Sequence, residues 1–469
     1  MKKPPSLHIL LLVIINLIIF GCNNEPSDQV LPPNIVFIMA DDLGYNDLGC
    51  YGQEKIKTPN IDQLAREGLK FSQFYAGATV CGPSRSVLLT GQHGGHTRIR
   101  GNTCSIGGTI GYKNGRQLRR MNLLEEDITV GNVLQNASYR TCLVGKWHID
   151  GFNPDAGPLD RGFDEFYGRL TRTDSLHQPP YWPQKWFNNR DLVDIPENQN
   201  GNKGYYRTDM NTDNAIQFIE RNKANPFFLL LSYSNPHSPY DAPDLSAYEN
   251  EDWPVEEKTY ATMIQHLDAS VGRVMQTLEQ LSLSRNTIVF FCSDNGPRSE
   301  NRDAQPRVID FFDSNGQLKG YKRDLYEGGI RVPMIVHWPG KVPENKTSET
   351  QWYFADFLPT AAALVGGQFP EDIDGVNMLP TLLDQNDRQT ERFLYWEYFG
   401  RDFQQAVRWK KWKAIRLKAG EPLLLFDLSQ DLGEENNVAE EYPVVIKEIE
   451  MYLKTARTES VNWPLPKFK

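Results

Sequence analysis

Asn34-Ile35-Val36-Phe37-Ile38-Met39-Ala40-Asp41-Asp42-Leu43-Gly44 is the stretch of sequence that decides the fold class of this chain. Its run from Ile35 to Ala40 is apolar and contains β-branched residues, which is typical of a strand that is buried on both faces. Residues 287–292, Thr-Ile-Val-Phe-Phe-Cys, and residues 227–231, Phe-Phe-Leu-Leu-Leu, have the same character. These runs predict a parallel or mixed sheet that is covered on both faces.

The segments between these strands carry helix signals. At residues 58–67, Pro59 occupies the first turn and Gly68 follows the last. Strands that alternate with helices indicate an α/β domain, which we place at residues 33–380. Beyond it, short aromatic-rich segments at 393–398, 405–415 and 423–428 precede an expected helix at 442–455. They predict a small C-terminal α+β subdomain, residues 381–469, with a short antiparallel sheet.

Two of the predicted strands end in acidic residues. Asp41 and Asp42 follow the first strand, and Asp294 and Asn295 follow the strand at 287–292. Because ligands collect beyond the carboxyl ends of strands in open α/β sheets, these two tips can converge. Their oxygen donors suit Ca²⁺ or Mg²⁺ and not zinc or copper. Either tip alone is better explained by an Asx-turn or a helix cap than by a metal site.

A cysteine begins another expected helix, in Cys81-Gly82-Pro83-Ser84-Arg85, and Thr90-Gly91 ends that helix. Pro83 fixes φ in the first turn, so the Cys81 side chain lies at a helix N-terminus, where anions bind. The alternative is a half-buried thiol at the start of an ordinary helix.

The run from Cys81 to Gly91 resembles the signature of type I, formylglycine-dependent sulfatases of the arylsulfatase and N-acetylgalactosamine-6-sulfatase kind. Residues 139–148 resemble the second signature of that family, with Ser138 where the family usually has glycine. The resemblance extends from about Pro33 to Gly375 and implies an alkaline-phosphatase-like α/β/α sandwich with a mixed central sheet. It also implies that a formylglycine-generating or anaerobic sulfatase-maturating enzyme oxidises Cys81 to formylglycine (3-oxoalanine).

The resemblance also implies a metal site and a set of catalytic groups. One Ca²⁺ per chain is expected, with Mg²⁺ less favoured, and repulsion among the acidic ligands would make the ion structural as well. One hydroxyl of the hydrated formylglycine would attack sulfur, with His148 as base for the other and His237 as acid for the departing sugar oxygen. The implied metal ligands are Asp41, Asp42, Asp294, Asn295 and the modified Cys81, and the implied catalytic residues are Cys81, Arg85, Lys146, His148, His237 and Lys322.

Substrate recognition is expected from a loop after the Cys81 helix. His96, Arg98 and Arg100 alternate there, which would point them to one side, toward the sugar that bears the sulfate. A solvated basic turn is the alternative. The aromatic run at 177–187 is open between stacking on a sugar face and ordinary loop packing. His266 and His337, within an expected helix and an expected strand, are predicted to be packing residues.

The overall charge separates a local feature from a global one. The 469 residues carry a formal net charge of −10, and no basic run could neutralise phosphates, which excludes nucleic acid as a partner. An anionic sulfate ester must therefore be attracted by a local cluster of cations in a pocket.

The N-terminus predicts export. Residues 1–22 have two lysines, an apolar run and the ending Ile19-Phe20-Gly21-Cys22, which resembles a bacterial lipobox, and residues 23–32 have the composition of a tether. Lipidation of Cys22 stays open because Phe20 is bulky for its place. The expected location is the bacterial periplasm or, as a lipoprotein, the outer membrane or cell surface, with membrane contact only through a lipid anchor.

The remaining cysteines are assigned no chemistry. Cys142 and Cys292 lie within predicted core strands and are expected to be buried thiols. A disulfide between Cys50 and Cys104 is permitted in an oxidising compartment, but nothing in the sequence requires it.

The sequence thus predicts an exported sulfatase that acts on a sulfated polysaccharide or oligosaccharide. An algal glycan of the ulvan, carrageenan or agar type and a glycosaminoglycan all remain open as substrates. The enzymatic alternative is a phosphatase or phosphonate hydrolase of the same superfamily. The other alternative is a lipoprotein that binds sulfated glycans without turnover, if Cys81 is unmodified.

Overall fold

The computed structural model describes residues 32–298, 308–385, 391–400 and 402–466, and from Pro32 onward these belong to one compact unit. The predicted signal segment with Cys22 and the predicted tether up to Leu31 lie outside the described residues. Within the described ranges, no helix combines the length and the apolar character needed to cross a membrane.

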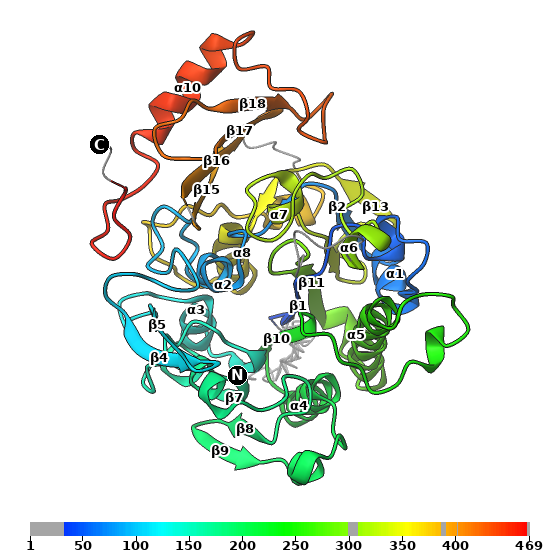
Figure 1. Cartoon of the computed structure of the whole chain (residues 1–469). Coiled ribbons are helices and arrows are strands. Elements are labelled where there is room, and N and C mark those ends of the chain that lie inside the picture. The colour runs from blue at the N-terminus through cyan, green and yellow to red at the C-terminus, as the bar shows by residue number, and fades with distance from the viewer. Residues whose placement is uncertain (1–31, 299–307, 386–390, 401, 467–469) are drawn as a thin grey trace, which may run out of the picture. The chain divides into compact units, whose positions relative to one another are not determined.

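A ten-stranded mixed sheet forms the centre of the described chain (Figure 1). Its middle strands are parallel, and antiparallel strands extend the sheet on both sides. In sheet order the strands are β13 (Lys346–Ser348), β2 (Leu69–Phe71), β12 (Met334–His337), β11 (Thr287–Ser293), β1 (Asn34–Asp41), β10 (Phe227–Pro236), β6 (Arg140–Lys146), β7 (Glu165–Arg169), β8 (Lys185–Asn188) and β9 (Asp191–Asp194).

Both faces of this sheet are covered, as the apolar strands predict. Along β1, Ile35, Phe37 and Met39 belong to one hydrophobic cluster, and the alternating residues belong to the other. Because side chains alternate across a strand, a strand that is apolar throughout must have a packed layer on each side. Helices α1 (Pro59–Arg66), α4 (Arg207–Asn222) and α5 (Val255–Gln280) cover one face, and α2 (Cys81–Thr90), α3 (Val130–Asn136) and α8 (Phe357–Val365) cover the other.

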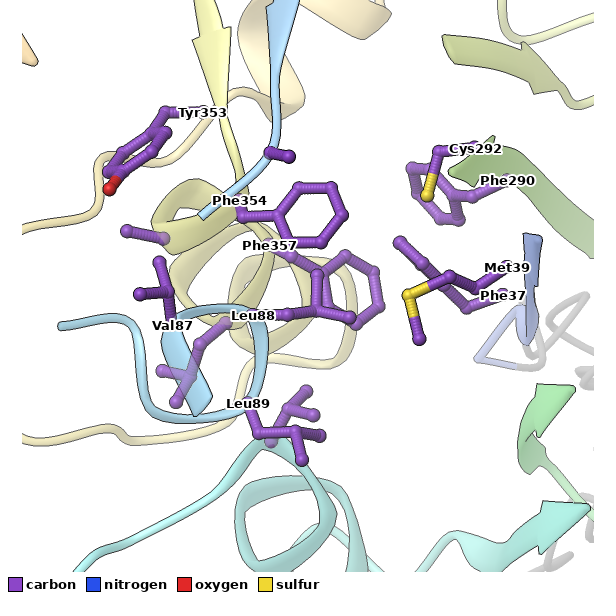
Figure 2. Packing of buried hydrophobic residues seen from close by; sticks show 14 of the residues in the cluster. Phe37, Met39, Val87, Leu88, Leu89, Phe290, Cys292, Tyr353, Phe354 and Phe357 are labelled. Atoms are coloured by element: carbon purple, nitrogen blue, oxygen red, sulfur yellow. The ribbon is translucent and has the colours of Figure 1, made fainter. Parts of the chain in front are cut away.

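The packing of α2 fixes the position of its first residue, Cys81. Figure 2 shows Leu88 of α2 and Phe357 of α8 directed toward Phe37 and Met39 of β1. The rings of Phe37 and Phe357 lie 4.4 Å apart between centroids. Helix α2 ends at Gly91, which has a φ of +70° that an L-residue with a side chain adopts only at a cost. Packing along its length and the turn at Gly91 therefore fix the position of the helix.

A separate four-stranded antiparallel sheet follows near the C-terminus, with α10 (Pro443–Leu453) packed on it. Its strands are β15 (Phe393–Phe399), β16 (Phe403–Trp409), β17 (Trp412–Arg416) and β18 (Leu424–Asp427). The α/β fold class with a small C-terminal antiparallel sheet is thus confirmed. The segment at 405–415, expected as one unit, contains two strands, because Lys410 has a φ of +54° and reverses the chain there. The domain boundary near residue 380 stays a prediction.

The remaining elements lie in the connections. Strands β4 (Thr109–Lys113) and β5 (Arg116–Arg120) form a hairpin, and β3 (Phe74–Tyr75) pairs with β14 (Trp352–Tyr353). The short helices are α6 (Val308–Phe311), α7 (Glu327–Ile330) and α9 (Leu379–Leu382). Cys50, Cys104, Cys142 and Cys292 are free thiols in this structure, so the permitted disulfide is not formed.

Candidate active site

The two acidic strand tips meet at one edge of the sheet. Strands β1 and β11 are parallel neighbours, with Ala40 opposite Ser293, and the Asp294 backbone N–H donates to the Ala40 oxygen. The backbone then turns sharply at Asp42, whose φ is +67° and whose N–H lies 3.3 Å from Asp294 Oδ1. Asn295 Nδ2 donates to Asp42 Oδ1 at 2.8 Å. The sequence prediction that these tips converge is confirmed by this geometry.

Asp41, Asp42, Asp294 and Asn295 together form an acidic group at this edge of the sheet. Cys81 lies against it. Its Sγ is 3.3 Å from Asp41 Oδ1 and accepts from Lys322 Nζ at 3.1 Å. Burial, together with the charges of Asp294 and Asp41, raises the pKa of the Cys81 thiol to about 12. The unmodified side chain is therefore a neutral thiol near neutral pH and a poor nucleophile.

Three buried cations, Lys146, Lys322 and Arg85, surround the carboxylates. Lys146 Nζ donates to Asp41 Oδ2 at 2.5 Å, and Lys322 Nζ donates to Asp42 Oδ1 at 2.5 Å. Burial alone would raise the pKa of Asp41, but Lys146 and its other cationic neighbours hold it well below the usual value. Asp42 and Asp41, with Cys81, raise the pKa of Lys322 against the effect of burial.

Arg85 holds this arrangement from behind. Its Nε and Nη2 donate to Asp294 Oδ2 at 3.0 and 2.7 Å, and its Nη1 donates to the Lys146 oxygen and to Ser232 Oγ. Arg85 is 2 % exposed. These contacts make Arg85 a positioning residue for one acidic tip and for the lysine that faces the other.

The acidic group fits a hard divalent cation. Among the described residues, Asp42 Oδ2 and Asn295 Oδ1 are buried and have no hydrogen-bond partner. Ligand atoms of Asp41, Asp42, Cys81 and His237 lie within 4.8 Å of one another. Unpartnered oxygens in such a group are suitable donors for calcium. Arg85, Lys146 and Lys322 contact the three aspartates and oppose the repulsion between them.

The two predicted catalytic histidines, His148 and His237, line the same pocket. His148 follows the end of β6, has a φ of +69° and lines the pocket together with Lys146. Burial and then Lys146 lower the pKa of His148 well below its usual value. His237 Nε2 lies 3.6 Å from Asp42 Oδ2, and burial lowers the pKa of His237 to about 3 although Asp42 and Asp41 oppose the shift.

A pocket of about 510 Å³ opens onto these groups. Its lining includes the predicted site residues Asp41, Cys81, Lys146, His148, His237 and Lys322. Asp42, Arg85, Asp294 and Asn295 are buried against them. The size is suitable for a sugar unit with substituents.

The aromatic run at 177–187 contributes buried packing residues, of which Tyr181 and Trp186 also line the pocket. Tyr181, Trp182, Trp186 and Phe187 are all buried. The Tyr181 hydroxyl lies 2.7 Å from the Ser234 oxygen and 2.5 Å from the His237 oxygen, so it fixes the loop that carries His237. His266 contacts Asp209 and Tyr206, and His337 is buried in β12, which agrees with the packing roles predicted for both.

The structure does not bring His96, Arg98 and Arg100 to the pocket. His96 Nδ1 lies 2.9 Å from Asp374 Oδ1, and Arg98 forms ion pairs with Asp127 and Glu126. Arg100 is 3 % exposed and contacts Glu397 and Thr458 of the C-terminal part. The expectation of sugar contact by these three residues is corrected: the loop is a tight turn in which they join distant segments, and none lines the pocket.

Sequence reasoning missed other cations of the pocket wall. Lys113, Arg120, Arg169 and Arg207 line it, and they come from the β4–β5 hairpin, β7 and the start of α4. No motif marks them in the sequence, because only the sheet order and the folding of the hairpin bring them together.

Comparison with known proteins agrees with the family resemblance that the sequence motifs indicate. Residues 33–367 match the family described as Sulfatase, and residues 319–459 match the one described as N-sulphoglucosamine sulphohydrolase, C-terminal. The chain is 31 % identical to N-acetylgalactosamine-6-sulfatase of Canis lupus familiaris, over 86 % of this chain and 74 % of that protein. It is 28 % identical to steryl-sulfatase of Mus musculus, over 94 % of this chain and 84 % of that protein.

Solved structures share the fold as well. The crystal structure of Ps i-CgsB in complex with k-i-k-neocarrahexaose superposes with a TM-score of 0.77 and 29 % identity, covering 92 % of this chain and 95 % of that one. A structure from work on the metabolism of multiple glycosaminoglycans by Bacteroides thetaiotaomicron has a TM-score of 0.74 and 26 % identity, covering 91 % and 99 %. With its acidic strand tips, buried cysteine and basic pocket, the chain belongs to the sulfatase family and is a sulfuric ester hydrolase.

Proposed function

We propose that this chain is an exported, formylglycine-dependent sulfatase that removes sulfate from a sulfated polysaccharide or oligosaccharide, with one calcium ion in its acidic group. The observation that carries the proposal is the position of Cys81. Its Sγ lies between the Asp41 carboxylate and the Lys322 ammonium, at 3.3 and 3.1 Å, in a pocket that holds two further candidate proton carriers, His148 and His237.

Two groups would complete this site. Asp41, Asp42, Asp294, Asn295 and the modified Cys81 would hold calcium, which supplies positive charge beside the nucleophile and the sulfate. Formylglycine made from Cys81 would supply a hydrated aldehyde, whose two hydroxyls allow both attack on sulfur and release of sulfate.

The side chains of the pocket bind and orient the sulfate ester. The Lys322 ammonium contacts Cys81 Sγ, and the Lys146 ammonium contacts Asp41, which lies beside Cys81. Both would hold the sulfate oxygens by charge-assisted hydrogen bonds. Arg85 does not line the pocket and fixes Asp294 and the backbone oxygen of Lys146.

The two histidines would carry protons. His148 Nδ1 is buried without a hydrogen-bond partner in the described part of the chain, so it is free to accept the proton of a nearby hydroxyl. His237 Nδ1 lies 2.5 Å from the Ser238 oxygen, a contact that leaves Nε2 directed at the site. We assign to His237 the protonation of the departing sugar oxygen. The Ser238 carbonyl can only accept, so Nδ1 carries the proton of the neutral ring, and Nε2 must first take up a proton, which a bound anionic sulfate would favour.

The carbohydrate substrate is supported by similar proteins. One solved structure of 29 % identity was determined in complex with k-i-k-neocarrahexaose, and one relative of 31 % identity is an N-acetylgalactosamine-6-sulfatase. Sulfated galactose-type sugars and glycosaminoglycans are therefore the first substrates to test. Export and lipidation of Cys22 rest on the sequence of residues 1–31.

The decisive experiment changes the nucleophile. Cys81→Ala should abolish sulfate release from the sulfated oligosaccharide that the wild type hydrolyses, while its circular dichroism stays unchanged. Cys81→Ser should be inactive or stall as a sulfated enzyme, because serine has no second hydroxyl. Repeated turnover by Cys81→Ser at the wild-type rate would contradict the proposal.

Mass spectrometry of the Cys81 peptide is the matching control. Conversion of the thiol to an aldehyde should reduce the peptide mass by about 18 Da. An active wild-type protein with an unmodified thiol would exclude formylglycine. An unmodified and inactive protein that still binds sulfated glycans would instead indicate a binding protein.

A further inference from the structure

Arg207 is a buried cation of the pocket wall without an anionic partner among the described residues. It is 2 % exposed, and its Nη1 donates to the Pro180 oxygen at 3.2 Å. Its guanidinium lies over the Trp186 ring, 5.0 Å from the centroid. Its Nε and Nη2 have no hydrogen-bond partner in the part of the chain that the structure describes, although a buried donor normally has one.

The position of Arg207 does not favour a positive charge. It is the first residue of α4, where the positive end of the helix dipole opposes a cation. Burial and the charge of Arg169 lower the pKa of Arg207 to about 9. A buried charge that is unpaired and held at this helix end does not contribute to folding stability, so its role must be sought in the pocket.

Three neighbouring cations of the wall pair with the same carboxylate, Asp174. Asp174 pairs with Arg169, lies 3.3 Å from Arg120 Nη1 and lies 3.9 Å from Lys113 Nζ. Asp150 also attracts Arg120, but two carboxylates do not neutralise three positive charges, and Arg207 adds a fourth. The Trp186 indole N–H, also at the pocket, is a further buried donor with no partner in the described ranges.

We propose that this wall binds a second anionic group of the substrate, a sulfate or a uronate carboxylate, beside the sulfate that is hydrolysed. The inference rests on the proposed function, since it assigns the substrate class of the same site. The second anion would accept from the free Nε and Nη2 donors of Arg207, and Lys113, Arg120 and Arg169 would add positive charge around it. The substrate is accordingly a glycan with two closely spaced anionic groups, and not a neutral sugar with one sulfate.

The test measures binding to the full-length protein that carries Cys81→Ala, so that no probe is turned over and no sulfated enzyme can form. Titration calorimetry compares N-acetylgalactosamine 6-sulfate, N-acetylgalactosamine 4,6-disulfate and the chondroitin 6-sulfate disaccharide, which share one sulfated sugar, with inorganic sulfate as the reference for the first anion site. The second anion should tighten binding by about tenfold or more, the value of a charged hydrogen bond. The disulfate and the uronate probes decide which anion is preferred.

Substitution of Arg207 should remove that gain. Arg207→Met should bind all three sugar probes with similar affinity and still bind inorganic sulfate, whereas Arg207→Lys should keep part of the gain because it keeps the charge. Arg221→Met is the matched control, since Arg221 lies on the same helix in an exposed pair with Glu165. It should leave the gain unchanged.

Thermal unfolding separates binding from packing. The melting temperature of Arg207→Met should equal or exceed that of its parent, because an unpaired buried cation is removed. A lowered melting temperature with the gain retained in Arg207→Lys and Arg207→Met alike would make Arg207 a packing residue. A parent that binds inorganic sulfate but gains nothing from a second anion contradicts this inference alone, whereas failure to bind sulfate at all contradicts the proposed function.

Discussion

At the scale of single residues, Ser138 departs from the sulfatase signature, which usually has glycine there, and its backbone conformation shows what that glycine is for. Ser138 lies in the turn between α3 and β6, is exposed and has a φ of +67°. This is the left-handed region, where an L-residue with a Cβ is strained and glycine is not. Glycine at this place therefore adopts the left-handed conformation without strain, whereas serine adopts it at a cost in free energy.

Ser138→Gly should consequently stabilise the protein. We expect about 0.5–1 kcal/mol in the free energy of unfolding, since relief of strain exceeds the entropy that glycine adds to the unfolded chain. Calorimetric melting with Ser138→Ala as control measures it, because alanine keeps the Cβ. Equal melting temperatures for the glycine and alanine variants would show that Ser138 is not strained.

Removal of the metal is a second test at this scale. Chelation should abolish activity but should not unfold the protein, because Arg85, Lys146 and Lys322 balance the aspartates in the ion-free site. The free energy of unfolding that chelation removes should depend on the free calcium concentration before chelation. It should be about 2.7 kcal/mol when that concentration is a hundred times Kd. Melting curves and activity after readdition of Ca²⁺ or Mg²⁺ measure both effects.

Calcium should restore more activity than magnesium, which demands near-ideal octahedral geometry. Chelator that is saturated with calcium beforehand serves as the control. One equivalent of zinc in the active protein would contradict the assignment, as would global unfolding on chelation.

At the scale of elements, one glycine permits two strands to approach. Gly145 of β6 has a φ of +106° and lies opposite Ser232 of β10. A Cβ at this position would lie 2.0 Å from the Ser232 backbone oxygen. The close approach lets Ser232 Oγ contact the Lys146 oxygen and Arg85, so the glycine helps to position the site.

Gly145→Ala should destabilise the protein by about 2–5 kcal/mol and reduce sulfate release, because the strands must separate and Lys146 must move. Gly340→Ala is the control, since Gly340 has a φ of +72° but a Cβ added there would meet no atom within 4 Å. Melting temperature and kcat/KM of the two variants separate the clash from backbone strain. If both variants lost the same stability, the contact with Ser232 would be unimportant.

At the scale of the whole molecule, a buried charge network joins the central sheet region to the C-terminal sheet. Lys413 of β17 is completely buried, and its Nζ lies 2.9 Å from Glu327 Oε1 of α7 and 3.4 Å from Glu434 Oε1. Burial raises the pKa of Glu434 to about 7, and Lys413 opposes that shift. Near neutral pH, Glu434 is therefore partly protonated in the folded protein, whereas the same side chain is ionised in the unfolded chain.

This network predicts a pH dependence of stability. Because the folded pKa of Glu434 is raised, its contribution is fully present below the ordinary glutamate pKa and is lost as pH rises through about 7. Glu434→Gln keeps an acceptor for the Glu327 N–H and removes the titration. The melting temperature of Glu434→Gln should therefore rise relative to wild type between pH 5 and pH 8.

Comparison with wild type at each pH controls for Asp47 and Asp294, whose pKa values are also raised to about 6. A constant difference between the two proteins across this range would show that Glu434 does not titrate there.

The sequence by itself determined the parts of this protein that are encoded in short segments. Apolar runs such as residues 34–41 predicted the buried strands, because a strand covered on both faces needs no partner-specific pattern. The tips Asp41 and Asp294, the Cys81 helix start and Lys146 were found because each lies directly beside a recognisable element. Their roles in catalysis stay predictions.

Only the tertiary structure decided the walls of the pocket. Arg207 and Lys113 lie far apart in sequence, and the loop with Arg98 and Arg100 turns toward Asp127 and Glu397 instead of the pocket. The two-residue reversal at Lys410 likewise depends on strand pairing across the C-terminal sheet. Such choices depend on which distant charges and surfaces meet after folding, and a local pattern of residues carries no information about those partners.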